Sequence, residues 1–333
     1  NDASTVAQGE SLVQTEIKTT NETLNTEISE NSNTYAENSN NYKIFSESDK
    51  TQVEEKITQL VTKLTIGLTT EFPMIPGAAG SSNGKSFQVA FYMWPNEVTV
   101  SEYELFLNHL LLNGNYQEFE SYRPNLNNHS VSSLSDEDVA FFHQYFTDEK
   151  YSNHPVIFVS AEGAQAYCKW LQDLVNQQNK FEQNKTTVVR LPSKWEWERA
   201  AAGGKEHIDY GTADGQLATG FMHHNPEANY REYQRNSFSF TNTKTQKKEK
   251  HLTQFFQFTT PVKSFKPNSY GLFDMSGNVS EMVIDMNGKI MTKGGNWNSS
   301  KEFLKIRDDD FNEFPKGAIA SPFIGFRPVL NFN

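Results

Sequence analysis

One short segment in the C-terminal third of the chain has the residue types and the spacing of a calcium site. It begins at Asp274, continues through Gly277 and Val279, and ends at Glu281. The two carboxylates offer side-chain oxygens and the residues between them offer backbone carbonyls. Calcium takes about six to eight oxygen ligands in flexible loops, so the pattern predicts a calcium site. The alternative is that Asp274 and Glu281 only cap a turn.

Other metal-binding and nucleophilic residue types are scarce. Because Cys168 is the single cysteine, a disulfide within the chain and a cysteine-based zinc site are both excluded. Cys168 lies in an apolar helical pattern, so we expect it in the core rather than as a nucleophile. His223 and His224 are adjacent and would point to opposite faces of a strand. We find no three-histidine spacing that suits a mononuclear iron site.

Composition and charge argue against a nucleic-acid partner and against a transmembrane segment. The chain has 333 residues and a net charge of −11. A phosphate-binding surface needs a basic face, so we do not expect nucleic acid as a partner. The sequence holds no run of about 18 apolar residues, so it predicts no transmembrane segment. Aromatic residues make up 13% of the chain, which is enough for a large packed core.

Residues 1–50 differ in composition from the rest of the chain. They contain nine acidic residues and three lysines, so they account for more than half of the net charge of −11. Asn, Ser and Thr fill most of the remainder, and such a segment cannot bury enough apolar surface to offset its ordering entropy. We expect an extended or disordered acidic arm, which is either a solvated tether or a segment that orders on a partner.

Residues 51–71 predict an amphipathic helix and a linker. Thr51 and Glu54 have the spacing of a capping box, and Gly67 suits the end of the helix. The apolar stripe that follows the cap predicts one buried face. Its residues are Val53, Ile57, Leu60, Val61 and Leu64.

Residues 72–333 predict one α+β domain with much irregular structure. Alternating apolar residues favour a strand over 87–91, and the periodicity predicts little helix after residue 240. Helices are predicted over 100–113, 160–176 and 193–201. Arg190 and Arg327 stand among apolar residues, where a guanidinium needs a carboxylate or several carbonyls as partners. The candidates are Glu196, Glu198 and Asp274.

Five segments in order give the chain a resemblance to the formylglycine-generating-enzyme family, also called the sulfatase-modifying-factor domain. They are 91–106, 154–171, 190–201, 268–281, and Gly294-Gly295-Asn296-Trp297 with Gly325-Phe326-Arg327-Pro328-Val329. The resemblance covers roughly residues 70–330 and implies a C-type-lectin-like domain. It also implies calcium at Asp274, Gly277, Val279 and Glu281. A second calcium site of the family maps, with a poorer match, onto Asn229, Tyr230, Gln254 and Phe256.

The enzymes that the chain resembles bind copper through two cysteines shortly after the Gly-Gly motif. Alignment on Gly294 places Ser299 and Leu304 at those two positions. A hydroxyl is a poor copper(I) ligand and an isobutyl group is none. The resemblance therefore implies no copper and no formylglycine generation, since that chemistry needs two thiols and the chain has one.

We therefore expect a non-catalytic structural or interaction protein. Non-catalytic relatives in bacterial gliding motility and type IX secretion suggest an outer-membrane, periplasmic or cell-surface assembly, with a cytoplasmic location as the alternative. The 1–50 arm would bind the other proteins of the assembly, and a lipid anchor upstream of Asn1 would suit it. Two other hypotheses stay open. One is a metal-dependent oxidoreductase that uses a site without cysteine. The other is a lectin-like module that binds glycan or protein near Trp297 and Phe323.

Overall fold

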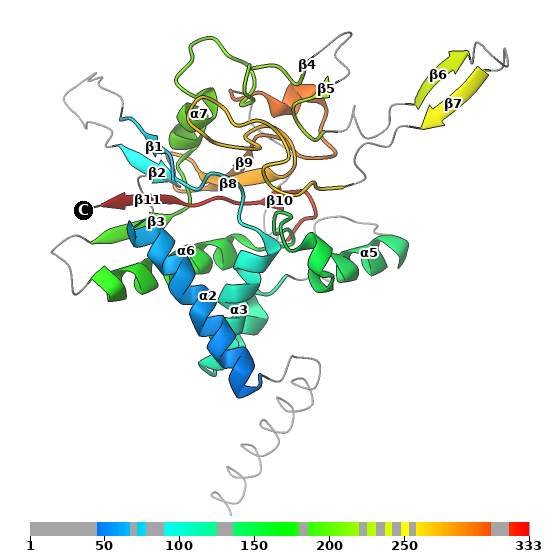
Figure 1. Ribbon diagram of the computed structural model, residues 1–333. Coiled ribbons are helices and arrows are strands. Elements are labelled where there is room, and N and C mark those ends of the chain that lie inside the picture. Colours follow the sequence, from blue (N-terminus) through cyan, green and yellow to red (C-terminus); the bar gives the residue numbers. More distant parts are fainter. Residues whose placement is uncertain are drawn as a thin grey trace, which may run out of the picture. The chain divides into compact units, whose positions relative to one another are not determined.

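The structure is a computed structural model (Figure 1) that divides into two compact units, Asn1–Gln52 and Val53–Asn333. It describes residues 45–66, 72–77, 90–124, 136–179, 186–219, 225–230, 237–241, 248–252, 258–307 and 320–332. Most of the predicted arm lies outside these ranges. Within the described part, no helix is long and apolar enough to cross a membrane.

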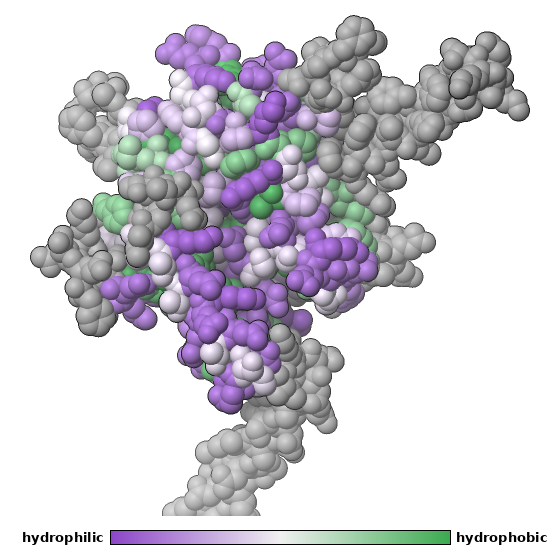
Figure 2. Space-filling view, in the orientation of Figure 1, coloured by the Kyte–Doolittle hydropathy of each residue, from purple (hydrophilic) through white to green (hydrophobic). Residues whose placement is uncertain are grey.

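Helix α2 (Glu47–Ile66) starts before the predicted first residue 51, so its predicted start was wrong. The N-terminal pair is Ser46 and Asp49, whose side chains each accept a hydrogen bond from the other's backbone N–H. Thr51 lies inside the helix and donates its hydroxyl to the Glu47 carbonyl. The stripe is buried as predicted at its first, second, fourth and fifth positions, while the outer face is hydrophilic (Figure 2).

In the described ranges, the remaining α-helices lie before residue 203. The predictions over 100–113, 160–176 and 193–201 correspond to α3 (Val100–Leu112), α6 (Ala161–Asn179) and α7 (Lys194–Ala202). Thr99 with Glu102, and Ser193 with Glu196, form the capping boxes of α3 and α7. Three further elements were not predicted: α4 (Tyr116–Tyr122), α5 (Asp136–Thr147) and the 3₁₀ turn η1 (Glu149–Tyr151).

The larger sheet has four strands in the order β1-β2-β11-β3. These are β1 (Met74–Ile75), β2 (Phe91–Met93), β11 (Val329–Phe332) and β3 (Thr187–Arg190). The last strand of the chain therefore lies between β2 and β3, antiparallel to both (Figure 1). The predicted strand over 87–91 shares only Phe91 with β2, and residues 87–89 lie outside the described part.

Side chains of α6 bond to the outer edge of β3. The Asn176 amide donates to the Thr187 carbonyl at 2.9 Å and accepts from the Thr187 N–H at 2.8 Å. One turn earlier, Gln172 Oε1 accepts from the Val189 N–H at 3.2 Å. Three backbone groups that face away from β11 are thus satisfied by a helix rather than by another strand.

The described residues of the second half of the domain form loops, short strands and a 3₁₀ turn. A three-stranded sheet has the order β10-β8-β9, with β10 (Ile324–Gly325) parallel to β8 (Ser280–Ile284) and β9 (Ile290–Lys293) antiparallel to β8. Two hairpins add β4 (Ala218–Thr219) with β5 (Asn225–Pro226), and β6 (Ser237–Thr241) with β7 (Lys248–Leu252). After residue 240 the only helical element in the described ranges is the 3₁₀ turn η3 (Lys301–Leu304). The expected mixed α+β architecture is confirmed.

One hydrophobic cluster joins the two larger sheets to α7. One face of the four-stranded sheet contributes Phe91 and Val329, α7 contributes Trp197, and β8 contributes Val283. A second cluster places α5 against Phe158, a buried residue with a left-handed backbone (φ 58°). Such a backbone is costly for an aromatic residue, so packing against α5 must offset the strain.

Candidate functional site

The loop that precedes β8 has an unusual backbone. Asp274, Gly277 and Asn278 all have positive φ angles, of 57°, 85° and 62°. Asp and Asn tolerate this region because their short polar side chains can bond locally. A Cβ atom on Gly277 would lie 2.4 Å from the Asn229 carbonyl oxygen. The loop is therefore packed directly against the backbone near Asn229, and only glycine fits at 277.

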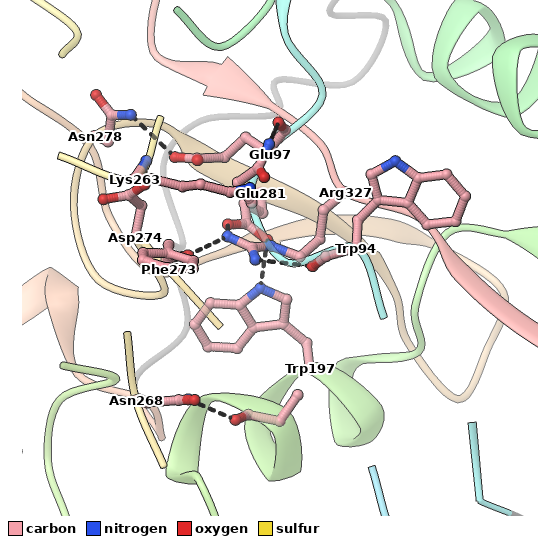
Figure 3. Close-up of polar contacts among 12 residues, drawn as sticks. Trp94, Glu97, Trp197, Lys263, Asn268, Phe273, Asp274, Asn278, Glu281 and Arg327 are labelled. Atoms are coloured by element: carbon pink, nitrogen blue, oxygen red, sulfur yellow. Dashed lines mark hydrogen bonds and ion pairs between the residues drawn. The ribbon is translucent and has the colours of Figure 1, made fainter. Parts of the chain in front are cut away.

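Three buried carboxylates come together beside this loop (Figure 3). Asp274 and Glu281 come from the predicted segment, whereas Glu97 comes from the residues just before α3. Their exposed fractions are 7%, 1% and 0%. Carboxylates at this depth must be paired with cations, hydrogen-bonded or protonated.

Glu281 is paired with Arg327. The guanidinium donates to both carboxylate oxygens, at 2.7 and 2.6 Å, and the Trp197 indole N–H donates to one of them at 2.8 Å. Arg327 also donates to the carbonyls of Trp94 and Phe273. Glu281 therefore serves as the counter-ion of the fully buried Arg327.

The arginine partners proposed from the sequence were thus half right. Arg190 pairs with Glu196 through two hydrogen bonds of 2.8 Å, as predicted. Arg327 pairs with Glu281, which was not among the candidates, because β10 and β8 run side by side. Glu198 instead pairs with the buried ammonium of Lys293 at 3.0 Å.

Glu97 and Asp274, which we call the carboxylate pair, each keep one oxygen without a hydrogen-bond partner. Glu97 Oε1 accepts from the Asn278 amide at 3.1 Å, and Asp274 Oδ2 accepts from the Lys263 N–H at 2.7 Å. Glu97 Oε2 and Asp274 Oδ1 are buried with no partner. Burial and the Asp274 charge raise the pKa of Glu97 well above its usual range. Burial also raises the pKa of Asp274 to about 6.

Two unsatisfied, buried carboxylate oxygens fit a hard cation such as calcium, whose charge would offset the repulsion between them. Gly277 and Val279 lie in the same loop and would add carbonyl oxygens, as the sequence pattern predicts. Glu281, the fourth predicted ligand, accepts hydrogen bonds from Arg327 and Trp197 through its carboxylate oxygens. Nowhere in the described ranges do three or more His, Cys, Asp or Glu side chains form a group that could hold a metal.

The second predicted calcium site is described only in part. Asn229 and Tyr230 are both buried, and the Asn229 amide donates to the Phe258 carbonyl at 2.7 Å. Gln254 and Phe256 lie outside the described residues. The second calcium site therefore stays a prediction.

The two positions aligned with catalytic cysteines hold a turn and a core residue. Ser299 Oγ accepts from the Asn296 N–H at 3.0 Å. Leu304 has 0% exposure and packs with Leu217 and Tyr230. Cys168 lies in α6 and is buried, as predicted, and burial raises the pKa of its thiol.

Half-buried aromatic rings continue from α5 to the C-terminal loop. Phe141 stacks on Phe258 with ring centroids 4.1 Å apart, Phe258 meets Trp297 at 5.2 Å, and Trp297 meets Phe323 at 4.9 Å. We call these four residues the aromatic row. It contains both residues that the sequence suggested for a lectin-like surface.

Glu97 belongs to the site but was not predicted from the sequence as a site residue. Glu97 lies in the 91–106 segment that carries the family resemblance, and its carboxylate stands between the apolar residues Trp94 and Val98. Its surroundings come from loops more than 170 positions further along the chain, because Asn278 bonds to it and Arg327 lies near it.

Comparison with known proteins gives a family model that matches most of the chain. Residues 45–332 match the family model FGE-sulfatase, described as the Sulfatase-modifying factor enzyme 1-like domain. The chain is 31% identical over 134 residues to the formylglycine-generating enzyme of Mus musculus, covering 40% of this chain and 28% of that protein.

Two further proteins are similar to the chain. The chain is 27% identical over 205 residues to serine/threonine-protein kinase pkn1 of Chlamydia pneumoniae, covering 55% of this chain and 25% of that protein. The solved structure of Treponema denticola variable protein 1 is 17% identical, with a TM-score of 0.47, and the match covers 78% of this chain and 94% of that one. The matched part of the chain thus spans about a quarter of the length of the mouse enzyme and of the chlamydial kinase.

Proposed function

The chain belongs to the family of Sulfatase-modifying factor enzyme 1-like domains, and from this premise we propose that it is a non-catalytic member that serves as a structural or interaction module. The observation that carries the proposal is the absence of a thiol pair. Ser299 and Leu304 stand at the two positions after the Gly-Gly motif, and the one cysteine is Cys168. A copper(I) site of the bis-thiolate kind cannot form from these residues.

The surroundings of those positions support the same proposal. Leu304 is fully buried, and its carbonyl accepts from the Ser276 hydroxyl at 2.9 Å. Cys168 is on α6, is buried, and has a raised thiol pKa, so it is protonated at neutral pH.

The test is to incubate the purified, copper-loaded protein with a cysteine-containing sulfatase peptide and to search for aldehyde by mass spectrometry. A formylglycine-generating enzyme assayed in parallel is the positive control. We expect no aldehyde from this protein. Turnover that survives Cys168→Ala would overturn the non-catalytic proposal and favour a metal centre without cysteine. Turnover abolished by Cys168→Ala would instead make Cys168 part of an active site.

We also propose that the carboxylate pair binds calcium as a structural cofactor, with the carbonyls of Gly277 and Val279 as further ligands. In this proposal Glu281 orients the loop through Arg327 rather than binding the cation by itself. Calcium should raise the melting temperature of the protein over that in chelator, and isothermal titration calorimetry should detect binding. Asp274→Asn should remove both effects. Equal melting temperatures in calcium and in chelator for the unsubstituted protein would overturn the calcium site, and the carboxylates would then only cap a turn.

For partners and location, we propose a bacterial cell-envelope or surface assembly in which the acidic 1–50 arm binds other proteins. The composition of the arm supports this, since it offers charge and hydrogen-bonding groups but few residues for a core. Subcellular fractionation of the source cells, with and without residues 1–44, tests the proposal. Recovery of the full chain in the cytoplasmic fraction alone would overturn it.

Binding of glycan or protein at the aromatic row is the second candidate function. The specific observation is the unbroken series of ring contacts from Phe141 to Phe323 at half-buried positions. If this function holds, the protein should bind ligands on a glycan or peptide array, and Trp297→Ala should abolish that binding. If the protein binds no ligand on the array, this candidate function is wrong.

A further inference from the structure

Asn278 is bonded to four separate segments of the chain. Its side-chain amide donates to Glu97 Oε1 at 3.1 Å, and its Oδ1 accepts from the Thr260 N–H at 2.8 Å. Its backbone N–H donates to the Asn229 carbonyl at 2.8 Å, and its carbonyl accepts from the Trp297 N–H at 2.9 Å. The residue is 1% exposed. Any change in the position of Asn278 is therefore transmitted to all four segments.

Asn278 also lies directly beside the proposed cation site. The Glu97 carboxylate lies between Asn278 and the proposed cation site. Its Oε1 bonds to Asn278, and its Oε2 is the buried oxygen without a partner (Figure 3). A cation held by Glu97 Oε2 and Asp274 Oδ1 would fix the rotation of the Glu97 carboxylate. It would thereby fix Oε1 as the acceptor for Asn278.

On the other side, Asn278 holds the loop that carries Trp297. Besides the backbone bond to Asn278, the Trp297 indole N–H donates to the Pro322 carbonyl at 3.0 Å. The ring contacts Phe258 and Phe323, so the position of this loop sets the position of the middle of the aromatic row. Thr260, two residues after Phe258, is bonded to Asn278 through both its N–H and its hydroxyl.

We propose that Asn278 is a positioning residue that couples cation binding at the carboxylate pair to the order of the aromatic row. The occupied site reduces local opening of the Trp297 loop and of the Phe258–Thr260 segment, and the empty site lets them open. The inference rests on the proposed calcium site and extends it, because it makes the presentation of a surface depend on a buried ion.

The experiment measures hydrogen exchange at single amides, by mass spectrometry with fragmentation, in calcium and in chelator. The reporters are the amides of Trp297 and Thr260, which donate to the backbone and side chain of Asn278. We expect calcium to slow exchange at both by about tenfold or more. Amides in the middle of α6 serve as the internal control for global stabilisation. Calorimetry on the same samples reports whether calcium binds.

Asn278→Gly is the decisive variant, because glycine accepts the positive φ and keeps the backbone hydrogen bonds while the side chain is removed. We expect it to bind calcium and yet to lose the calcium-dependent slowing at Trp297 and Thr260. Asn287→Gly, at the exposed β8–β9 turn, is the matched control and should respond like the unsubstituted protein. If Asn278→Gly does not fold, Glu97→Gln replaces it, since it keeps an acceptor for Asn278 but lacks the charge. It should lose both calcium binding and the slowing.

The outcomes separate the two proposals. If calorimetry detects no calcium binding to the unsubstituted protein, the calcium site is wrong and the coupling falls with it. If calcium binds and raises the melting temperature while exchange at Trp297 and Thr260 follows the α6 control, the site stands and the coupling is overturned. Calcium-dependent slowing that persists in Asn278→Gly overturns the role of Asn278. Slowing that persists in Glu97→Gln overturns the assignment of Glu97 as a cation ligand, and the proposed coupling through Glu97 falls with it.

Discussion

At the scale of single residues, the Arg327–Glu281 pair has no access to water, so each charge depends on the other. Both side chains are at most 1% exposed. Arg327→Met would leave the Glu281 carboxylate buried with the Trp197 indole but without its counter-ion. We expect a loss of about 3–5 kcal/mol in the free energy of unfolding, measured by urea denaturation.

The matched control for that substitution is Lys169→Met, which removes an exposed ion pair with Asp173 on α6. Exposed pairs contribute about 1 kcal/mol or less. Equal losses for the two variants would contradict the role assigned to the buried pair.

The carboxylate pair also predicts how stability depends on pH when calcium is absent. The folded protein raises the pKa of Asp274 from 3.8 to about 6, so between these values the native state binds more protons than the unfolded state. Stability then falls as pH rises through this window, because the ionised form is the one that burial penalises. Relative to Asp274→Asn, we expect the unsubstituted protein in chelator to lose roughly 2–3 kcal/mol between pH 4 and 7. Urea denaturation at each pH measures the difference, and a constant difference would contradict the prediction.

At the scale of elements, the loop before β8 depends on a close approach that only glycine permits. Gly277 and Gly288 have similar backbones, with φ of 85° and 77°, but a Cβ would meet the Asn229 carbonyl at 2.4 Å in the first and nothing within 4 Å in the second. Gly288→Ala should lower the free energy of unfolding by about 1–2 kcal/mol, which is the cost of a left-handed backbone for alanine. Gly277→Ala should lower the free energy of unfolding by clearly more, as measured by urea denaturation, and should abolish stabilisation by calcium. Equal losses would mean that the loop can move away from Asn229.

Elements defined by local patterns could be predicted from the sequence, and those defined by distant contacts could not. α3 follows from the Thr99–Glu102 capping box and an apolar stripe on one face. The first turn of α2 was misplaced because Ser46 with Asp49 and Thr51 with Glu54 offer two overlapping caps, which local sequence does not rank. α5 was missed because its burial depends on Phe158 and Phe258, which reach it from other parts of the chain.

The same distinction explains the candidate site. Asp274 and Glu281 were found because both lie in one short segment. Glu97 and Arg327 join them only through the packing of β10 beside β8 and through Asn278, and no local spacing encodes those contacts. Sequence therefore located the loop but not the charges that surround it.

At the scale of the whole molecule, the buried residues of α2 begin at Val53, after the acidic arm ends. A chain starting at residue 45 should therefore melt within a few degrees of the full chain by circular dichroism. A chain starting at residue 67 is the contrasting control, because it loses the buried side chains of Val53, Ile57, Val61 and Leu64. Each such side chain contributes about 1.5–3 kcal/mol when fully buried, so this deletion should lower stability by several kcal/mol. Loss of cooperative melting in the shorter deletion would place part of the arm in the core.

The hydrogen bonds from Gln172 and Asn176 to β3 have a consequence for aggregation. An open sheet edge can recruit another chain, and here the outward groups of Thr187 and Val189 are occupied by side chains of α6. That protection lasts only as long as the last two turns of α6 stay folded. Conditions that fray these turns before the sheet itself unfolds would expose a ready template for intermolecular strand pairing. Aggregation would then begin from a nearly native state rather than from the unfolded chain.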